Sequence, residues 1–128
     1  MGTFHISCKI ENTVRRERSA VVSKVLVDTG SENTWIPATI LEKLGIKREK
    51  KDVPFVTANG QQITRNVGFA VIRVDKYVTV DEVVFAEKGD LLLLGARTLE
   101  GLNLVVDSRR KRLVAAGPLP AAGVNVLR

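Results

Sequence analysis

Apolar and polar side chains alternate one by one along several short segments of this chain. From Phe4 to Ile10 every second residue is apolar, which is the pattern of a strand with one buried face. Residues 20–28, 69–74 and 78–85 are further runs rich in valine, a residue type that favours strands. The pattern predicts about seven short strands in all and therefore a mostly-β domain.

One segment, residues 37–45, has the signals of a helix instead. Its isoleucine and leucines fall on one stripe, Pro37 suits the first helical position, and Gly45 is a common residue just past a helix end. A shorter helical turn is expected from Thr98 to Leu102. We therefore expect one main short helix beside the strands.

Two hairpins are predicted from their turns. Residues 53–68 form the first, because Asn59-Gly60 is the strongest short signal for a tight turn and both residue types tolerate positive φ. The basic run at 109–112 lies between two apolar segments and is expected to be the solvated turn of the second. The charged segment 47–52 is expected to be a linker before the first hairpin.

The composition fits one globular domain. The chain has 128 residues, 45% hydrophobic and 27% charged, and this length suits a single domain with a real core. The only cysteine, Cys8, is expected in that core, and its being alone favours a reducing compartment. The only histidine, His5, is expected on the exposed face. No segment has the length and apolarity of a signal peptide or a membrane span, which favours a cytoplasmic protein without a membrane partner.

The net charge of +6 raises the question of nucleic-acid binding. The basic clusters, at residues 15–18, 47–51 and 109–112, are scattered along the chain, and few aromatic residues lie among them to stack on bases. We therefore expect no nucleic-acid partner, and keep a basic nucleic-acid-binding domain only as the third functional alternative.

The segment LVDTGSENTW, residues 26–35, places a carboxylate at the tip of a tight turn that follows an apolar strand. Ionising Asp28 in apolar surroundings is costly. Either its side chain bonds to nearby backbone, as aspartates in turns do, or it is held there for chemistry. Gly30 lets backbone approach the carboxylate without a Cβ in the way, and Thr29 and Ser31 supply hydroxyls that can fix the loop.

Asp28-Thr29-Gly30 after an apolar strand is the active-site signature of aspartic proteases. The chain resembles the retropepsin-like members of that family, and most closely the single-lobe proteins found in microbes. LVDTGSENTWIP matches the catalytic loop, and TANGQQITRNVG stands where these proteins carry a flap hairpin. LLLLGARTLEGLNLVVD matches the apolar-apolar-Gly segment and the helix that close the fold. The resemblance implies a single-lobe acid-protease fold over residues 1–116, followed by a C-terminal tail, residues 117–128, in which VNVL is a candidate interface strand.

Hydrolysis of a peptide bond by an activated water needs one carboxylate as base and one carboxylic acid to protonate the carbonyl oxygen. Two such groups placed close together share a proton, because both cannot ionise side by side. The chain offers one such turn, since Asp107 in the similar stretch LVVDSRR lacks the following glycine and is expected to be a strand-end residue. We therefore expect a symmetric homodimer in which Asp28 of each chain meets at the two-fold axis. No metal and no cofactor are expected.

The resemblance assigns roles to individual residues. It implies that Asp28, Thr29 and Gly30 are catalytic, with Thr29 reaching across to the loop of the partner. The expected substrate-binding residues come from the loop and the flap and are Ser31, Glu32, Ala58, Asn59 and Gly60.

Three residues stay open between two roles. Trp35 could line the substrate cleft or be buried beside the catalytic strand. Glu32 could lie near the substrate backbone, as an acidic residue does in retroviral relatives, or be a plain exposed turn residue. Arg97 departs from the retroviral pattern because Ala96 separates it from the glycine, which leaves open whether the ion pair of that arginine carries over.

The leading functional hypothesis is an aspartic endopeptidase that binds an extended peptide between two protomers, under two flaps. The alternative of a different class is a catalytically silent dimeric module of the same fold, which binds peptides or serves in assembly.

Overall fold

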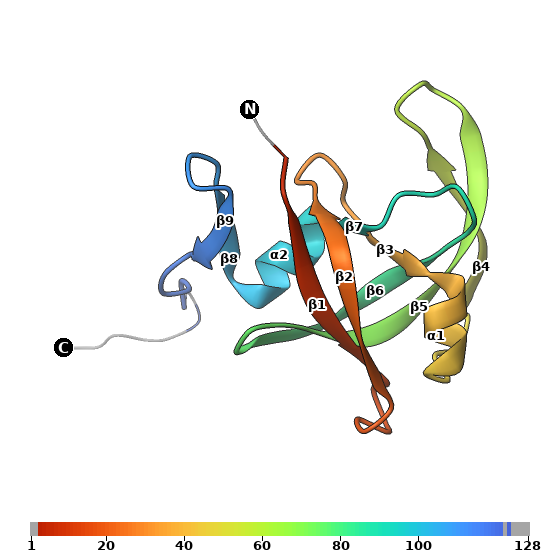
Figure 1. Cartoon of the computed structure of the whole chain (residues 1–128), viewed down its shortest axis with the longest axis horizontal. Helices are drawn as coiled ribbons and strands as arrows, with labels where there is room; N and C mark the ends of the chain where they lie inside the picture. The colour runs from red at the N-terminus through yellow and green to blue at the C-terminus, as the bar shows by residue number, and fades with distance from the viewer. Residues whose placement is uncertain (1–2, 122, 124–128) are drawn as a thin grey trace.

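The computed structural model describes residues 3–121 and 123, and this part of the chain is mostly β (Figure 1). Its strands are β1 (His5–Glu11), β2 (Ser19–Val27), β3 (Thr34–Pro37), β4 (Lys50–Val56), β5 (Gln62–Val74), β6 (Tyr77–Ala86), β7 (Leu93–Leu94), β8 (Leu104–Asp107) and β9 (Arg112–Ala115). Its helices are α1 (Ala38–Lys43) and α2 (Ala96–Leu102). The prediction of a mostly-β domain is confirmed, with more strands than the sequence pattern suggested.

Most strands belong to one strongly curved sheet, in the order β1-β2-β7-β3-β6-β5-β4. β1 also pairs with β5, through residues 9–11 and 71–73, so the sheet curls back on itself. β2 and β7 run parallel to each other, as do β3 and β6. The last two strands, β8 and β9, form a separate antiparallel hairpin.

The core lies inside this curled sheet. Its largest fully buried side chains include Ile10 of β1, Ile36 of β3, Leu41 of α1 and Phe85 of β6. α1 packs on β3 and β6, and α2 packs mainly on β6. Strands from both ends of the sequence therefore share one core.

The alternation predicted for the first strand is confirmed. Cys8 and Ile10 are buried, whereas His5, Ser7 and Lys9 are exposed. Burial raises the pKa of the Cys8 thiol to about 12, so the thiol stays protonated and acts as a small apolar side chain.

The segment before the first hairpin differs from the prediction. Residues 47–52 are not a linker throughout, because β4 already begins at Lys50. The second arm of the hairpin and the run 69–74 form one 13-residue strand, β5, whose pairing with β6 continues through Gly68. A Cβ on Gly68 would lie 2.3 Å from the carbonyl oxygen of Lys47. The glycine is thus required for close backbone approach and does not mark a break.

The predicted helix begins one residue late. Pro37 ends β3 and stands at the N-cap of α1, and Ile36 is fully buried in β3. Leu44 is the C-cap, and Gly45 follows it at φ +73°, as predicted from the preference of glycine for this position.

The hairpin predicted around the basic run is confirmed, because β8 and β9 pair and the turn between them is exposed. Asp107 ends β8 and accepts a hydrogen bond of 3.0 Å from the Arg110 side chain, which holds the pKa of that carboxyl below its usual range. Asp107 is therefore a strand-end residue, as expected.

The predicted tail strand, residues 124–127, lies outside the described residues. Within residues 3–121 and 123, no helix is long and apolar enough to cross a membrane.

Candidate active site

Asp28 directly follows β2 at an edge of the core. The last residues of β2, Leu26 and Val27, pair in parallel with Leu93 and Leu94 of β7. The backbone N–H of Asp28 donates to the carbonyl oxygen of Leu94 at 3.1 Å, which continues this pairing by one residue. The apolar strand thus brings a half-buried carboxylate to a fixed place.

The turn after Asp28 is closed by the aspartate itself. Its Oδ1 accepts a hydrogen bond of 2.9 Å from the N–H of Gly30, and its carbonyl oxygen accepts one of 3.2 Å from the N–H of Ser31. A Cβ on Gly30 would lie 3.2 Å from Oδ1, a contact tighter than most, so the carboxylate would have to shift slightly. Among the described residues the other oxygen, Oδ2, has no hydrogen-bond partner. One carboxylate oxygen therefore holds the turn, as in an Asx turn, and the other is left for chemistry.

The loop after this turn is fastened to the start of α2. The N–H of Ala96 donates to the carbonyl oxygen of Ser31 at 2.7 Å, and the N–H of Arg97 donates to that of Glu32 at 3.1 Å. A Cβ on Gly95 would lie 2.4 Å from the carbonyl oxygen of Asn33, so only glycine fits here. The apolar-apolar-Gly segment and the start of α2 thus supply the backbone that holds the Asp28 loop, which explains why this motif goes together with the Asp28 turn.

A buried chain of hydroxyls supports the same junction. The N–H of Gly95 donates to Oγ1 of Thr34 at 3.0 Å, and the hydroxyls of Thr34 and Thr98 lie 2.6 Å apart. The Thr98 hydroxyl donates to Oδ2 of Asp81 at 2.8 Å, so the Thr34 hydroxyl donates to Thr98. These roles of Thr34, Thr98 and Asp81 were not predicted from the sequence. The available signal was a threonine within each of two motifs, Thr34 in the Asp28 motif and Thr98 in the apolar-apolar-Gly motif.

A cleft of about 610 Å³ opens in front of Asp28. Figure 1 shows the loop after β2 and the tip of the β4–β5 hairpin at one end of the molecule, with the connection from β6 to β7 crossing between them. The cleft is lined by Asp28, Gly30, Ser31, Glu32, Asn33, Trp35, Phe55, Val56, Thr57, Ala58, Ile63, Gly89, Asp90, Leu91 and Leu93. Three segments far apart in the sequence therefore form its walls.

Trp35 combines the two roles left open by the sequence. Its side chain is half-buried, and its ring packs against that of Phe55 with 5.2 Å between centroids and 59° between ring planes. Phe55 pairs with Ile63 across the β4–β5 hairpin, and both of these residues line the cleft. Trp35 is thus a cleft residue and also a packing contact between the body of the domain and the hairpin.

The hairpin turns at Asn59-Gly60, as predicted. The N–H of Gly60 donates to the carbonyl oxygen of Thr57 at 2.9 Å, and the N–H of Thr57 donates to that of Gln61 at 2.8 Å. Gly60 has φ +86°, whereas Asn59 is not at positive φ. The turn is therefore of the three-residue kind, with glycine in the left-handed position. Ala58 lines the cleft. Asn59 and Gly60 are exposed at the tip of the hairpin and do not line the cleft.

Of the remaining predicted residues, Glu32 lines the cleft and Thr29 does not. Thr29 and Glu32 are both exposed. The Arg97 guanidinium lies 3.8 Å from the carboxylate of Glu82, and the Arg97 backbone contacts the carbonyl of Glu32. Arg97, which Ala96 separates from Gly95, thus forms its ion pair with a residue of β6.

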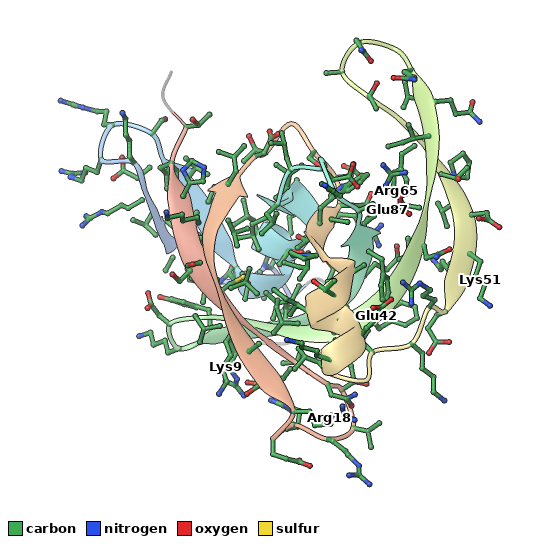
Figure 2. The ribbon with its side chains drawn as sticks, turned by 45° about the vertical axis from the view of Figure 1, so that its right-hand side comes forward. Lys9, Arg18, Glu42, Lys51, Arg65 and Glu87 are labelled. Carbon is green, nitrogen blue, oxygen red and sulfur yellow. The ribbon has the colours of Figure 1, made fainter. Side chains whose placement is uncertain are left out.

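An ion pair at the cleft was not predicted. Arg65 of β5 binds Asp90 through two hydrogen bonds, from Nε to Oδ2 at 2.7 Å and from Nη2 to Oδ1 at 2.9 Å. Figure 2 shows Arg65 reaching from the hairpin to the connection that carries Glu87. Asp90 lines the cleft, so this pair belongs to the site.

Within the described ranges, no group of three or more histidine, cysteine, aspartate or glutamate side chains could hold a metal ion.

The chain was compared with known protein families. Residues 18–101 match the model of the family described as gag-polyprotein putative aspartyl protease. The matched span includes the Asp28 turn, the β4–β5 hairpin and most of α2. No curated protein matches the chain.

Proposed function

Because the chain belongs to the retropepsin-like aspartyl protease family, we propose that it is an aspartic endopeptidase in which Asp28 from each of two protomers forms the catalytic pair. The observation that carries the proposal is the position of Asp28. This carboxylate lies on the wall of the cleft, with Oδ1 held by the N–H of Gly30. Its other oxygen is left to bind a water molecule.

One carboxylate cannot act alone in this chemistry, so a second copy of the chain supplies the other. The two carboxyl groups share one proton, because ionising both side by side is unfavourable. The ionised group takes a proton from water as the water oxygen attacks the scissile carbonyl carbon, and the protonated group gives its proton to the carbonyl oxygen. Collapse of the tetrahedral intermediate breaks the C–N bond: the carboxyl group that took the proton from water gives it to the leaving amine, and one hydroxyl proton of the intermediate returns to the other carboxylate.

Two further features fit a peptide substrate. The cleft walls carry apolar side chains from the hairpin and from β7, among them Phe55, Ile63 and Leu93. An extended peptide exposes its backbone N–H and C=O groups for strand-like pairing and its side chains for apolar contacts. Val56 and Leu91 are 72% and 65% exposed and also line the cleft, as expected of residues that a ligand or a second protomer covers.

We assign substrate contact to the loop and to the hairpin. Ser31 and Glu32 would lie beside the substrate backbone, and the hairpin tip at Ala58, Asn59 and Gly60 would act as a flap. The small side chain of Ala58 leaves room for a close backbone approach. The hairpin must open to admit a substrate and close over it, as the mobile loops of other enzymes do.

The second candidate is a catalytically silent dimeric peptide-binding or assembly module. It is favoured by the hydrogen bond from the Gly30 N–H to Asp28, because such a turn is stable without any catalytic role.

Substitution of Asp28 distinguishes the two candidates. Purified protein is incubated with a diverse peptide library between neutral and mildly acidic pH, with and without a statine-type inhibitor. Asp28→Asn should abolish cleavage and leave the unfolding midpoint nearly unchanged. Asp107→Asn is the matched control, because it removes a carboxylate of β8 that takes no part in the cleft. Cleavage that survives in Asp28→Asn, or that is lost equally in Asp107→Asn, would contradict the assignment.

A further inference from the structure

The ion pair between Arg65 and Asp90 joins two walls of the cleft. Arg65 belongs to β5, the second strand of the hairpin, and Asp90 belongs to the connection between β6 and β7. The guanidinium and the carboxylate meet in the two-pronged geometry in which arginine binds carboxylates most specifically. Their side chains are only 15% and 14% exposed, so water screens the pair less than it screens surface pairs.

The carboxylate of Asp90 also closes the turn in which it stands. Its Oδ2 accepts a hydrogen bond of 2.8 Å from the N–H of Glu87, and its own N–H donates to the carbonyl oxygen of Glu87 at 2.9 Å. Gly89 in this turn has φ +94°, a backbone conformation that favours glycine. The turn conformation and the position of Arg65 therefore depend on one carboxylate.

Both partners stand next to residues that line the cleft. Ile63 and Arg65 are two residues apart on β5, so their side chains lie on the same face of the hairpin. Ile63 lines the cleft from this face, and Leu91, next to Asp90, lines it from the β6–β7 connection. The ion pair thus fixes the spacing between the hairpin wall and the opposite wall.

Apart from the ion pair of Arg65 and Asp90, most interactions of the hairpin tip are hydrogen bonds within the tip. In the part of the chain that the structure describes, the hydrogen bonds of residues 57–61 join residues of the tip to one another. Two further contacts join the hairpin to the body of the domain near the cleft: the packing of Trp35 on Phe55, and an ion pair of Arg65 with Glu87 at 3.7 Å. Loss of the Asp90 carboxylate would leave one apolar contact and this longer, more exposed ion pair to hold the hairpin over the cleft.

We propose that Arg65 and Asp90 form a latch, a pair of positioning residues that holds the β4–β5 hairpin in place over the cleft and so sets the affinity for peptide. The proposal deepens the proposed function and rests on it for its kinetic consequences. The latch acts on peptide binding and not on the chemical step, because the carboxylate that reacts is that of Asp28.

The latch suits mildly acidic conditions. The hydrogen bonds from Arg65 lower the pKa of Asp90, and the N–H of Glu87 adds to this effect, although burial opposes it. A carboxyl whose pKa is lowered by folding keeps its contribution at pH values above its ordinary pKa and loses it only as the pH falls through the lowered value. The pair therefore remains ionised at a mildly acidic pH.

The first experiment needs no ligand. Hydrogen exchange is measured over residues 53–67 in the wild type, in Asp90→Asn and in Arg65→Gln. Both variants should exchange faster in this hairpin, by roughly tenfold, which lies within the range of coupling seen between residues in direct contact. Arg65→Lys keeps the charge without the two-pronged geometry, and it should give an intermediate effect in a folded protein. Unchanged exchange in a folded variant would overturn the latch.

The second experiment measures kinetics and binding. In the latch variants KM for a cleaved peptide should rise about tenfold while kcat changes by less than about twofold, which indicates loss of ground-state binding. The double variant should show clearly less than the product of the two single effects. Binding of a statine-containing peptide to Asp28→Asn protein, followed by Trp35 fluorescence, should weaken by the same factor when Asp90→Asn is added. This measurement tests the latch even if no peptide is cleaved.

The matched control is the ion pair of Glu11 and Arg73, at 2.6 Å, which involves β5 beyond the hairpin and is absent from the cleft lining. Glu11→Gln should lower stability and leave KM and hairpin exchange as in the wild type. If Glu11→Gln raises KM as much as Asp90→Asn does, the effect is one of general stability, and the latch is refuted.

Discussion

The hydroxyls of Thr34 and Thr98 lie 2.6 Å apart and are completely buried, although 64 positions separate them in the sequence. Thr34 begins β3, directly after the Asp28 loop, and Thr98 lies in the first turns of α2. Because Thr98 also donates to Asp81 of β6, one polar chain joins three elements around the site. Because the two hydroxyls are buried, each missing partner would be costly, so this polar chain holds the loop in one conformation.

Thr98→Val is therefore expected to destabilise the domain by about 1–3 kcal/mol, because it keeps the shape and leaves the Thr34 hydroxyl without its acceptor. Urea denaturation measures the change as a shift of the midpoint at constant slope. Thr39→Val, at an exposed position of α1, is the control and should stay within about 0.5 kcal/mol of the wild type. Equal stability of both variants would mean that the buried hydroxyl pair contributes nothing.

The parts of the site that the sequence predicted are local. The Asp28-Thr29-Gly30 turn consists of consecutive residues, and the hydrogen bond from the N–H of Gly30 to Asp28 Oδ1 joins residues two positions apart. The alternation of the first strand likewise reports burial directly, as the exposure of His5 and the burial of Cys8 demonstrate. Such features follow from the chain around them and need no knowledge of which strands pair.

The parts that the sequence did not predict depend on strand order. Arg65 and Asp90 meet only because the sheet brings β5 and the β6–β7 connection together. Hydrophobic period tells which face of a strand is buried but not which strand lies next to it. The hairpin tip was predicted at the right place, but the sequence did not predict its turn type, because Asn59 can adopt positive φ and does not do so here.

Activity per protomer is expected to fall on dilution, because the proposed site needs Asp28 from two chains. Specific activity measured over a wide range of concentrations should follow the dimer fraction found by sedimentation. A tandem fusion of two copies is the control and should keep its activity on dilution. A monomer that cleaves peptide at constant specific activity would refute the shared site.

Gly60→Val tests the flap. A Cβ at Gly60 meets no atom within 4 Å, so the only cost is the backbone strain of a β-branched residue at φ +86°. We expect KM to rise and kcat to fall, with a loss of stability of about 1–2 kcal/mol at most. Gly117, at φ +97° and equally open, is away from the cleft, and Gly117→Val should leave both constants unchanged. Wild-type kinetics in a folded Gly60→Val protein would mean that this hairpin is not a flap.

Glu11 should make stability depend on acid. Its side chain is buried, and the Nε atoms of Arg16 and Arg73 each lie 2.6 Å from one of its oxygens. Burial by itself raises the pKa of Glu11, but the hydrogen bonds and charges of the two arginines outweigh it, so the pKa lies below its usual value of 4.5. Because folding lowers this pKa, the carboxylate stabilises the fold above pH 4.5, and this contribution is lost as the pH falls through the lowered value.

Glu11→Gln should therefore destabilise the protein near neutral pH by roughly 1.5–3 kcal/mol, the range for hydrogen bonds to charged groups. The difference from the wild type should shrink as the pH falls below 4.5, because the wild-type carboxyl becomes protonated and resembles the amide. Urea unfolding at a series of pH values measures both effects. Glu17→Gln, an exposed position in the loop between β1 and β2, is the control and should follow the wild type throughout. A Glu11→Gln deficit that stays constant down to strongly acidic pH would show that the charge of Glu11 does not stabilise the fold.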